Sequence, residues 1–173
     1  LGMFPEDPLT PAGNYKKVIR VFHGSKGEKE TLVTSFYPSG QPHEYLETLR
    51  GQAWGAYKKW HTNGVLEIES SVQGGLGDLD EPAQSTWLFH GASKAYNEEG
   101  RLVASFNYKQ GLLEGCGFLY HPNGNLKQEF FYKNGKEVNR IKEHIPVRHS
   151  LLWGLGSRLW CSQWSKQPAA GQT

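Results

Sequence analysis

The chain has 173 residues, of which 37% are hydrophobic and 21% charged, and its formal net charge is +2. This length predicts a single domain. Residues 1–135 carry 13 basic and 15 acidic side chains, which argues against a nucleic-acid-binding protein because such proteins present basic surfaces. The sequence has no apolar run of 18 residues, so we expect no membrane-spanning helix.

Residues 1–30 are expected to form an N-terminal extension that could hold a first strand. The chain begins at Leu1 rather than at a methionine, and Pro5, Pro8 and Pro11 follow. We therefore expect that the start was trimmed and that a signal or lipidation segment was lost. A cytoplasmic location is favoured, and secreted or membrane-associated locations stay open.

Glycine spacing defines an array over residues 31–139. Two glycines eleven residues apart occur four times, as Gly40 and Gly51, Gly64 and Gly75, Gly100 and Gly111, and Gly124 and Gly135. An aromatic residue lies four positions before each leading glycine, at Phe36, Trp60, Tyr96 and Tyr120. The leading glycines are 24, 36 and 24 residues apart, so extra residues precede the third unit. A fixed period of this size predicts repeated supersecondary units.

Each unit of the array is expected to be a β-hairpin. Asn-Gly pairs at Gly64 and Gly124 are strong hairpin signals. After the last turn, bulky residues alternate with polar ones, as at Leu126, Phe130 and Tyr132, and this period of two predicts strands with one buried face. We therefore predict an all-β fold. It is an elongated, twisted antiparallel sheet of about four hairpin repeats of 24 residues, followed by a C-terminal tail or short helix.

The segment from Tyr120 to Gly135, which begins Tyr-His-Pro-Asn-Gly-Asn-Leu and ends Tyr-Lys-Asn-Gly, resembles the MORN repeat in its bacterial variant form. The segment from Tyr96 to Gly115 follows a similar pattern. The resemblance covers roughly residues 31–139 and implies a twisted sheet of successive hairpins. Bacterial proteins with this repeat are often grouped as antitoxin-like (the YwqK group), which implies protein binding, whereas eukaryotic MORN repeats are commonly linked with membranes.

Residues 76–90 form an insert in the array. Its acidic Asp78, Asp80 and Glu81, together with Trp87 and Phe89, could form a recognition loop for a protein partner. The alternative, which we favour, is that the end of the insert adds a strand that packs its aromatic residues while the acidic part is a solvated turn. A calcium site at the three carboxylates is disfavoured because the EF-hand ligand series is absent.

Residues 140–173 are expected to form a basic, Trp-rich tail or cap. Four of its residues could contact a membrane from a short amphipathic helix, namely Trp153, Arg158, Trp160 and Trp164. The favoured alternative is a cap that covers an open edge of the sheet. Charge alone would also fit a solvated tail.

The chain lacks the motifs that indicate catalysis or metal binding. Its seven histidines form no close metal-ligand pair, and the two cysteines, Cys116 and Cys161, lack zinc-site spacing. A nucleophile elbow, a phosphate loop and a dinucleotide fingerprint are all missing. We therefore predict neither an enzyme nor a cofactor nor a metal site. The predicted function is a non-catalytic protein-interaction module with an antitoxin-like role and an unidentified protein partner. The alternative is association with membrane lipid through the Trp-rich tail.

Overall fold

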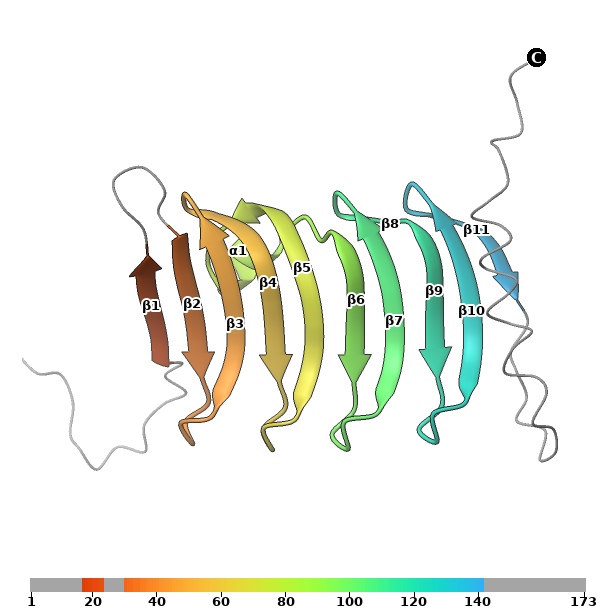
Figure 1. Ribbon diagram of the computed structural model, residues 1–173, viewed down its shortest axis with the longest axis horizontal. Helices are drawn as coiled ribbons and strands as arrows, with labels where there is room; N and C mark the ends of the chain where they lie inside the picture. Colours follow the sequence, from red (N-terminus) through yellow and green to blue (C-terminus); the bar gives the residue numbers. More distant parts are fainter. Residues whose placement is uncertain (1–16, 24–29, 142–173) are drawn as a thin grey trace, which may run out of the picture.

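The alternating segments form strands in the computed structural model, which describes residues 17–23 and 30–141. The strands in this part of the chain are β1 (Lys17–His23), β2 (Glu30–Phe36), β3 (Pro42–Leu49), β4 (Gln52–Trp60), β5 (Leu66–Leu76), β6 (Gly91–Tyr96), β7 (Leu102–Lys109), β8 (Leu112–Leu113), β9 (Gly115–Tyr120), β10 (Leu126–Lys133) and β11 (Lys136–Ile141). A short helix, α1 (Glu81–Gln84), lies between β5 and β6. The strands form one antiparallel sheet in chain order, with β8 paired beside β7. Figure 1 shows this open single layer, and the all-β prediction is confirmed.

The four glycine turns lie together where the strands end, along a border of the sheet that we call the lower edge (Figure 1). In every turn the glycine N–H donates to the carbonyl oxygen three residues earlier, from Gly40, Gly64, Gly100 and Gly124 to Tyr37, His61, Asn97 and His121, at 2.8–2.9 Å. The four glycines have φ values between 75° and 87°, a conformation that costs other residues energy. The Glu98-Glu99-Gly100 turn is equivalent to the others although it lacks the Asn-Gly pair. Glycine is therefore the shared requirement.

Three tight turns connect the hairpins at the opposite edge, which we call the upper edge. They are centred on Arg50-Gly51, Gln110-Gly111 and Asn134-Gly135, and both residues of each turn have positive φ. Two central residues with positive φ define the type I′ turn, whose twist matches that of the flanking strands. The second glycine of each eleven-residue pair thus marks a second kind of turn. At Gly75, the equivalent position in the second unit, the insert leaves the sheet instead.

The main core lies on one face of strands β2 to β5, which we call the insert face because the insert folds over it. Val33, Leu46, Tyr57 and Val72 from the sheet pack with Leu79 and Trp87 from the insert. The first repeat departs from the apolar pattern, yet its Glu44 and Thr48 are also buried. Their burial follows from the insert, which supplies a second layer over this part of the sheet.

The second half of the sheet covers the same face with its own aromatic rings. Phe106 lies 6.1 Å from Phe130 and 6.2 Å from Tyr132, measured between ring centroids. The Phe106 ring lies over Gly117, where an added Cβ would come within 2.4 Å of Phe106 Cδ1. Phe106 therefore packs over a small residue on the neighbouring strand. This agrees with the predicted alternation.

Side chains at the lower edge connect successive hairpins. The Tyr37 hydroxyl donates to the carbonyl oxygen of Trp60 at 2.7 Å. His61 Nε2 lies 2.9 Å from the carbonyl oxygen of Tyr96, and it must donate because a carbonyl only accepts. Both residues follow the repeat aromatic of their own unit and reach the aromatic of the next unit. This repeated position thus forms a structural connection between successive units.

Glu129 is an exception to the predicted alternation. It occupies a polar position of β10 that should face solvent, yet it is only 1% exposed. Within the described part of the chain, neither carboxylate oxygen has a hydrogen-bond partner, and burial raises the pKa of the Glu129 carboxyl. The expectation of a solvated carboxylate is therefore wrong at this residue.

Candidate functional site

The insert leaves and rejoins the sheet at the upper end of β5. Gly74 and Gly75 have φ values of 138° and 98°, and a Cβ at Gly75 would lie 2.5 Å from the Thr86 carbonyl oxygen. The returning chain pairs with β5, because Gln73 N–H donates to the Leu88 carbonyl at 2.8 Å and Leu88 N–H donates to the Gly74 carbonyl at 3.1 Å. The insert is therefore anchored at both ends.

A single helical turn, α1, shapes the acidic part of the insert. Asp80 caps it, since one carboxylate oxygen accepts from the Ala83 N–H at 2.9 Å. Pro82 lies in the first turn, where it needs no backbone donor, and Ala83 is buried against the sheet. The solvated turn that the sequence predicted is thus a capped helical turn, with Asp80 and Glu81 exposed on it.

Trp87 and Phe89 pack against the sheet. Trp87 is 6% exposed, its ring meets Tyr57 edge-on at 4.9 Å, and its Nε1 donates to the Leu76 carbonyl at 2.8 Å. Phe89 is half-buried and forms a bridge with Val72 of β5. In this position the two aromatics hold the insert in place. A direct contact between either residue and a partner stays a prediction.

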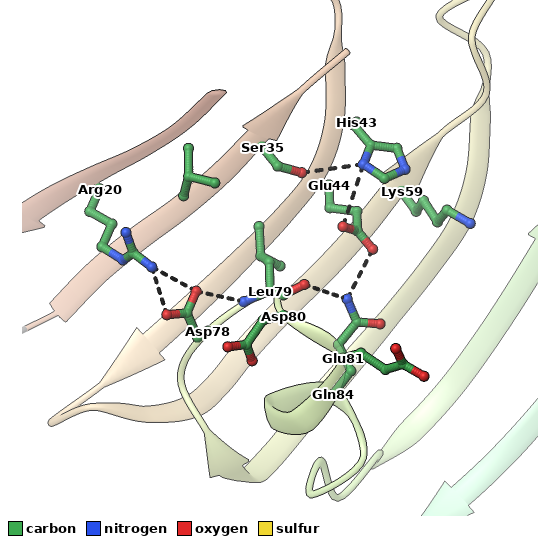
Figure 2. A pocket seen from close by; sticks show the side chains of 11 residues that line it. Arg20, Ser35, His43, Glu44, Lys59, Asp78, Leu79, Asp80, Glu81 and Gln84 are labelled. Carbon is green, nitrogen blue, oxygen red and sulfur yellow. Dashed lines mark hydrogen bonds and ion pairs between the residues drawn. The ribbon is translucent and has the colours of Figure 1, made fainter. Parts of the chain in front are cut away.

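An open cleft of about 580 Å³ lies between the acidic part of the insert and strands β1 to β4 (Figure 2). It brings together the three predicted acidic residues with strand residues from distant parts of the sequence. Its lining consists of Val18, Arg20, Ser35, His43, Glu44, Lys59, Asp78, Leu79, Asp80, Glu81 and Gln84. We call this space the insert cleft.

Polar contacts fix the two walls of the insert cleft to each other. Arg20 Nη2 donates to both carboxylate oxygens of Asp78, at 2.6 and 2.7 Å. Gln84 Nε2 donates to Glu44 Oε1 at 3.2 Å and to the Leu79 carbonyl at 2.7 Å. Figure 2 shows these contacts on either side of the opening. The cleft is therefore preformed.

Among the residues that the structure describes, negative charge dominates the insert cleft. Four carboxylates line it, and the facing cations are Arg20 and Lys59. Arg20 is paired with Asp78, and Lys59 is paired with Glu67 at 3.2 Å. Buried Glu44 accepts from the Tyr57 hydroxyl at 3.1 Å, and burial together with Glu44 raises the pKa of Tyr57 far above its usual range. The exposed carboxylates of Asp80 and Glu81 are left at the rim.

Sequence reasoning missed the strand side of the cleft. Arg20 and Asp78 are 58 positions apart, and no local pattern pairs them. Glu44 occupies a position that is apolar in the second and third repeats, where Ile68 and Ala104 lie. A glutamate at this position of the first repeat is the one local signal of the strand side of the cleft.

Ser35, His43 and Glu44 lie together but do not form a catalytic relay. His43 Nδ1 is 3.4 Å from Ser35 Oγ and 3.5 Å from Glu44 Oε2. A serine triad needs opposite ring nitrogens for the serine and the carboxylate, whereas here both contacts use one nitrogen. Ser35 is also fully buried. Over the described ranges, no three His, Cys, Asp or Glu residues form a group that could hold a metal.

The residues predicted to contact a membrane fall outside the part of the chain that the structure describes. They are Trp153, Arg158, Trp160 and Trp164. Within residues 17–23 and 30–141, no helix is long and apolar enough to cross a membrane.

Comparison with known proteins adds one finding. The MORN repeat variant family matches residues 113–134. This match spans β9, β10 and the turn between them, so the predicted resemblance is confirmed for the fourth hairpin. No curated protein and no solved structure matches the chain, and nothing supports a place in the YwqK-like antitoxin group. MORN repeats are a non-catalytic repeat type, consistent with a binding role.

Proposed function

We propose that this chain is a non-catalytic protein-binding module whose insert cleft receives a basic segment of a protein partner. The observation that carries the proposal is the preformed cleft of about 580 Å³ with an excess of carboxylates. A rigid, charged concavity favours a ligand of opposite charge without a cost of reorganisation. The MORN-type hairpin supports a binding role in general. The cleft supports a specific position for the binding site and a positively charged ligand.

Asp80 and Glu81 make the contacts in this proposal. Both are exposed at the rim, whereas Asp78 is already paired with Arg20 and the buried Glu44 already accepts from Gln84. A lysine or arginine of the partner would pair with the rim carboxylates, and its aliphatic part would lie against Leu79. An antitoxin-like role would be one form of this binding, in which the module masks a basic surface of a toxin.

The proposal is tested with a variant that removes charge without removing structure. In D80N/E81Q, asparagine keeps the helix cap because it caps as well as aspartate. The matched control, E98Q/E99Q, removes the same charge from the lower edge. Each full-length protein is used to capture partners from a lysate of the source organism, and captured proteins are quantified by mass spectrometry.

We expect at least one protein that the wild type and E98Q/E99Q capture equally and that D80N/E81Q captures about tenfold less. Its capture should also weaken as salt is raised, because exposed charge pairs are screened. Equal capture by all three proteins would refute the cleft as the binding site. Recovery only with membranes, lost on deletion of residues 148–173, would favour lipid docking instead.

A further inference from the structure

The two edges of the sheet differ in chemistry although both consist of hairpin ends. The exposed residues of the lower-edge turns are polar or are turn formers, namely Pro38, Ser39, Thr62, Asn63, Glu98, Glu99, Pro122 and Asn123. Large apolar side chains are exposed towards the upper edge, among them Trp54, Leu76, Leu88 and Leu112, which are between 43% and 58% exposed. We call these four residues the upper row. Solvent reaches both edges of the array, so exposure alone does not explain the difference.

Three residues of the upper row lie over or beside glycines of neighbouring strands. Leu88 lies over two glycines at once, since an added Cβ would be 3.1 Å from Leu88 Cδ1 at Gly74 and 3.0 Å from Leu88 Cδ2 at Gly111. Leu112 lies in the same way over Gly135, with a distance of 3.3 Å. Trp54 pairs with Gln73, directly beside Gly74. Apolar side chains that gather across several elements indicate an interaction surface more strongly than scattered ones.

Backbone groups at the upper edge are already used. The N–H groups of Gly77, Gly111 and Gly135 donate to carbonyl oxygens of Gly51, Phe89 and Leu113, at 2.8–3.0 Å. The Asn134 N–H donates to the Glu114 carboxylate at 2.7 Å. A partner strand would therefore find few backbone groups to pair with. A helix, whose backbone is satisfied internally, can bind through side chains alone.

Basic residues lie at the Leu112 end of the upper row. Lys109 is the strand partner of Leu112, and Lys133 and Lys136 bracket the turn at Gly135, beside Leu112. All three lysines are exposed. Cations beside an apolar surface favour a ligand whose own apolar side chains are flanked by carboxylates. From these observations, we propose that the upper row binds the apolar face of an acidic amphipathic helix of a protein partner.

This surface is separate from the insert cleft, which is acidic and lies on the insert face. The proposal therefore does not rest on the proposed function. If the two surfaces act independently, D80N/E81Q leaves binding at the upper row unchanged.

The probe is a fluorescein-labelled synthetic helix of about 18 residues, long enough to hold helical structure. Leucines occupy one stripe of this peptide and glutamates the rest. A second peptide replaces every glutamate with lysine, and a third scrambles the leucine stripe. Binding is measured by fluorescence anisotropy with the full-length protein and three variants. They are W54S/L76S/L112S in the upper row, K109Q/K133Q/K136Q beside it, and T62A/E98Q/E99Q at the lower edge. Circular dichroism establishes that each variant folds.

We expect the acidic peptide to bind, with an affinity about tenfold lower for W54S/L76S/L112S and a smaller, salt-dependent loss for K109Q/K133Q/K136Q. T62A/E98Q/E99Q and D80N/E81Q should match the wild type. Equal binding of the basic or scrambled peptide, or equal binding by folded W54S/L76S/L112S, would overturn the proposal. Binding to phosphatidylcholine–phosphatidylserine vesicles would also overturn the proposal if it depended on the upper row and no acidic peptide bound. Lipid would then be the ligand.

Discussion

Trp87→Ala tests whether the insert is part of the core. Trp87 is 6% exposed, and its ring lies between Tyr57 at 4.9 Å and Phe89 at 6.2 Å. Truncation of a buried tryptophan to alanine costs about 3–5 kcal/mol through lost burial and the cavity left behind. The lost hydrogen bond to the Leu76 carbonyl adds little, because Leu76 is 58% exposed and water can replace the donor. We therefore expect the free energy of unfolding to fall by about 4 kcal/mol.

Urea unfolding followed by far-UV circular dichroism measures this change. Trp54→Ala is the matched control, because it removes the same side chain from a site that is 48% exposed, and it should cost less than about 1 kcal/mol. The slopes of the two transitions are compared as well, since a repeat array can unfold in more than one step.

Equal losses for the two variants would refute the argument that the insert packs as core. The same conclusion would follow if Trp87→Ala exposed residues 76–90 to protease while the unfolding transition stayed unchanged. The insert would then be a separate unit lying on a sheet that does not need it.

Three further predictions concern single residues of the sheet. Glu129→Gln should raise the free energy of unfolding at pH 7 by about 1–3 kcal/mol, because it removes a buried charge that has no partner among the residues that the structure describes. Burial raises the pKa of the Glu129 carboxyl, so the folded state holds its proton more tightly and wild-type stability should fall as pH rises above the ordinary carboxyl range. Denaturant titrations across pH should show a smaller fall for Glu129→Gln, and identical pH profiles would contradict the assignment. Gly117→Ala should destabilise by about 1–3 kcal/mol, because the new methyl group meets the Phe106 ring, and a neutral result in thermal melts would mean that the ring moves freely. Gln110→Asn should stabilise by about 0.5–1 kcal/mol, since Asn134 already fills the equivalent turn position and asparagine tolerates positive φ. A lower melting temperature for Gln110→Asn would argue against this turn geometry.

Most of the fold could be predicted from local sequence patterns. The leading glycines predicted the lower-edge turns, because a residue with positive φ favours glycine wherever it occurs. The upper-edge turns were harder to recognise. Arg50 and Gln110 adopt positive φ although neither residue type signals it, so only the recurring glycine beside them marked these positions.

The site depended on contacts that local patterns do not encode. Asp78, Asp80 and Glu81 were selected from the sequence, yet the cleft they line exists because Trp87 and Leu79 bury themselves on strands far away in the chain. Burial of Glu129 likewise arises from tertiary packing, since its position in the alternation predicts solvent. Composition can thus single out residues of the insert, but only the tertiary structure shows which residues surround them.

The strand order has a consequence for how the chain folds. Apart from the short β8, every strand pairs with the strands next to it in sequence. Most β proteins fold slowly because distant segments must meet before any contact stabilises them. Here each hairpin can form from neighbouring residues and offer a template to the next, so the sheet can grow outward from any hairpin. The insert can fold only after β2 to β5 have formed, because it packs against their surface.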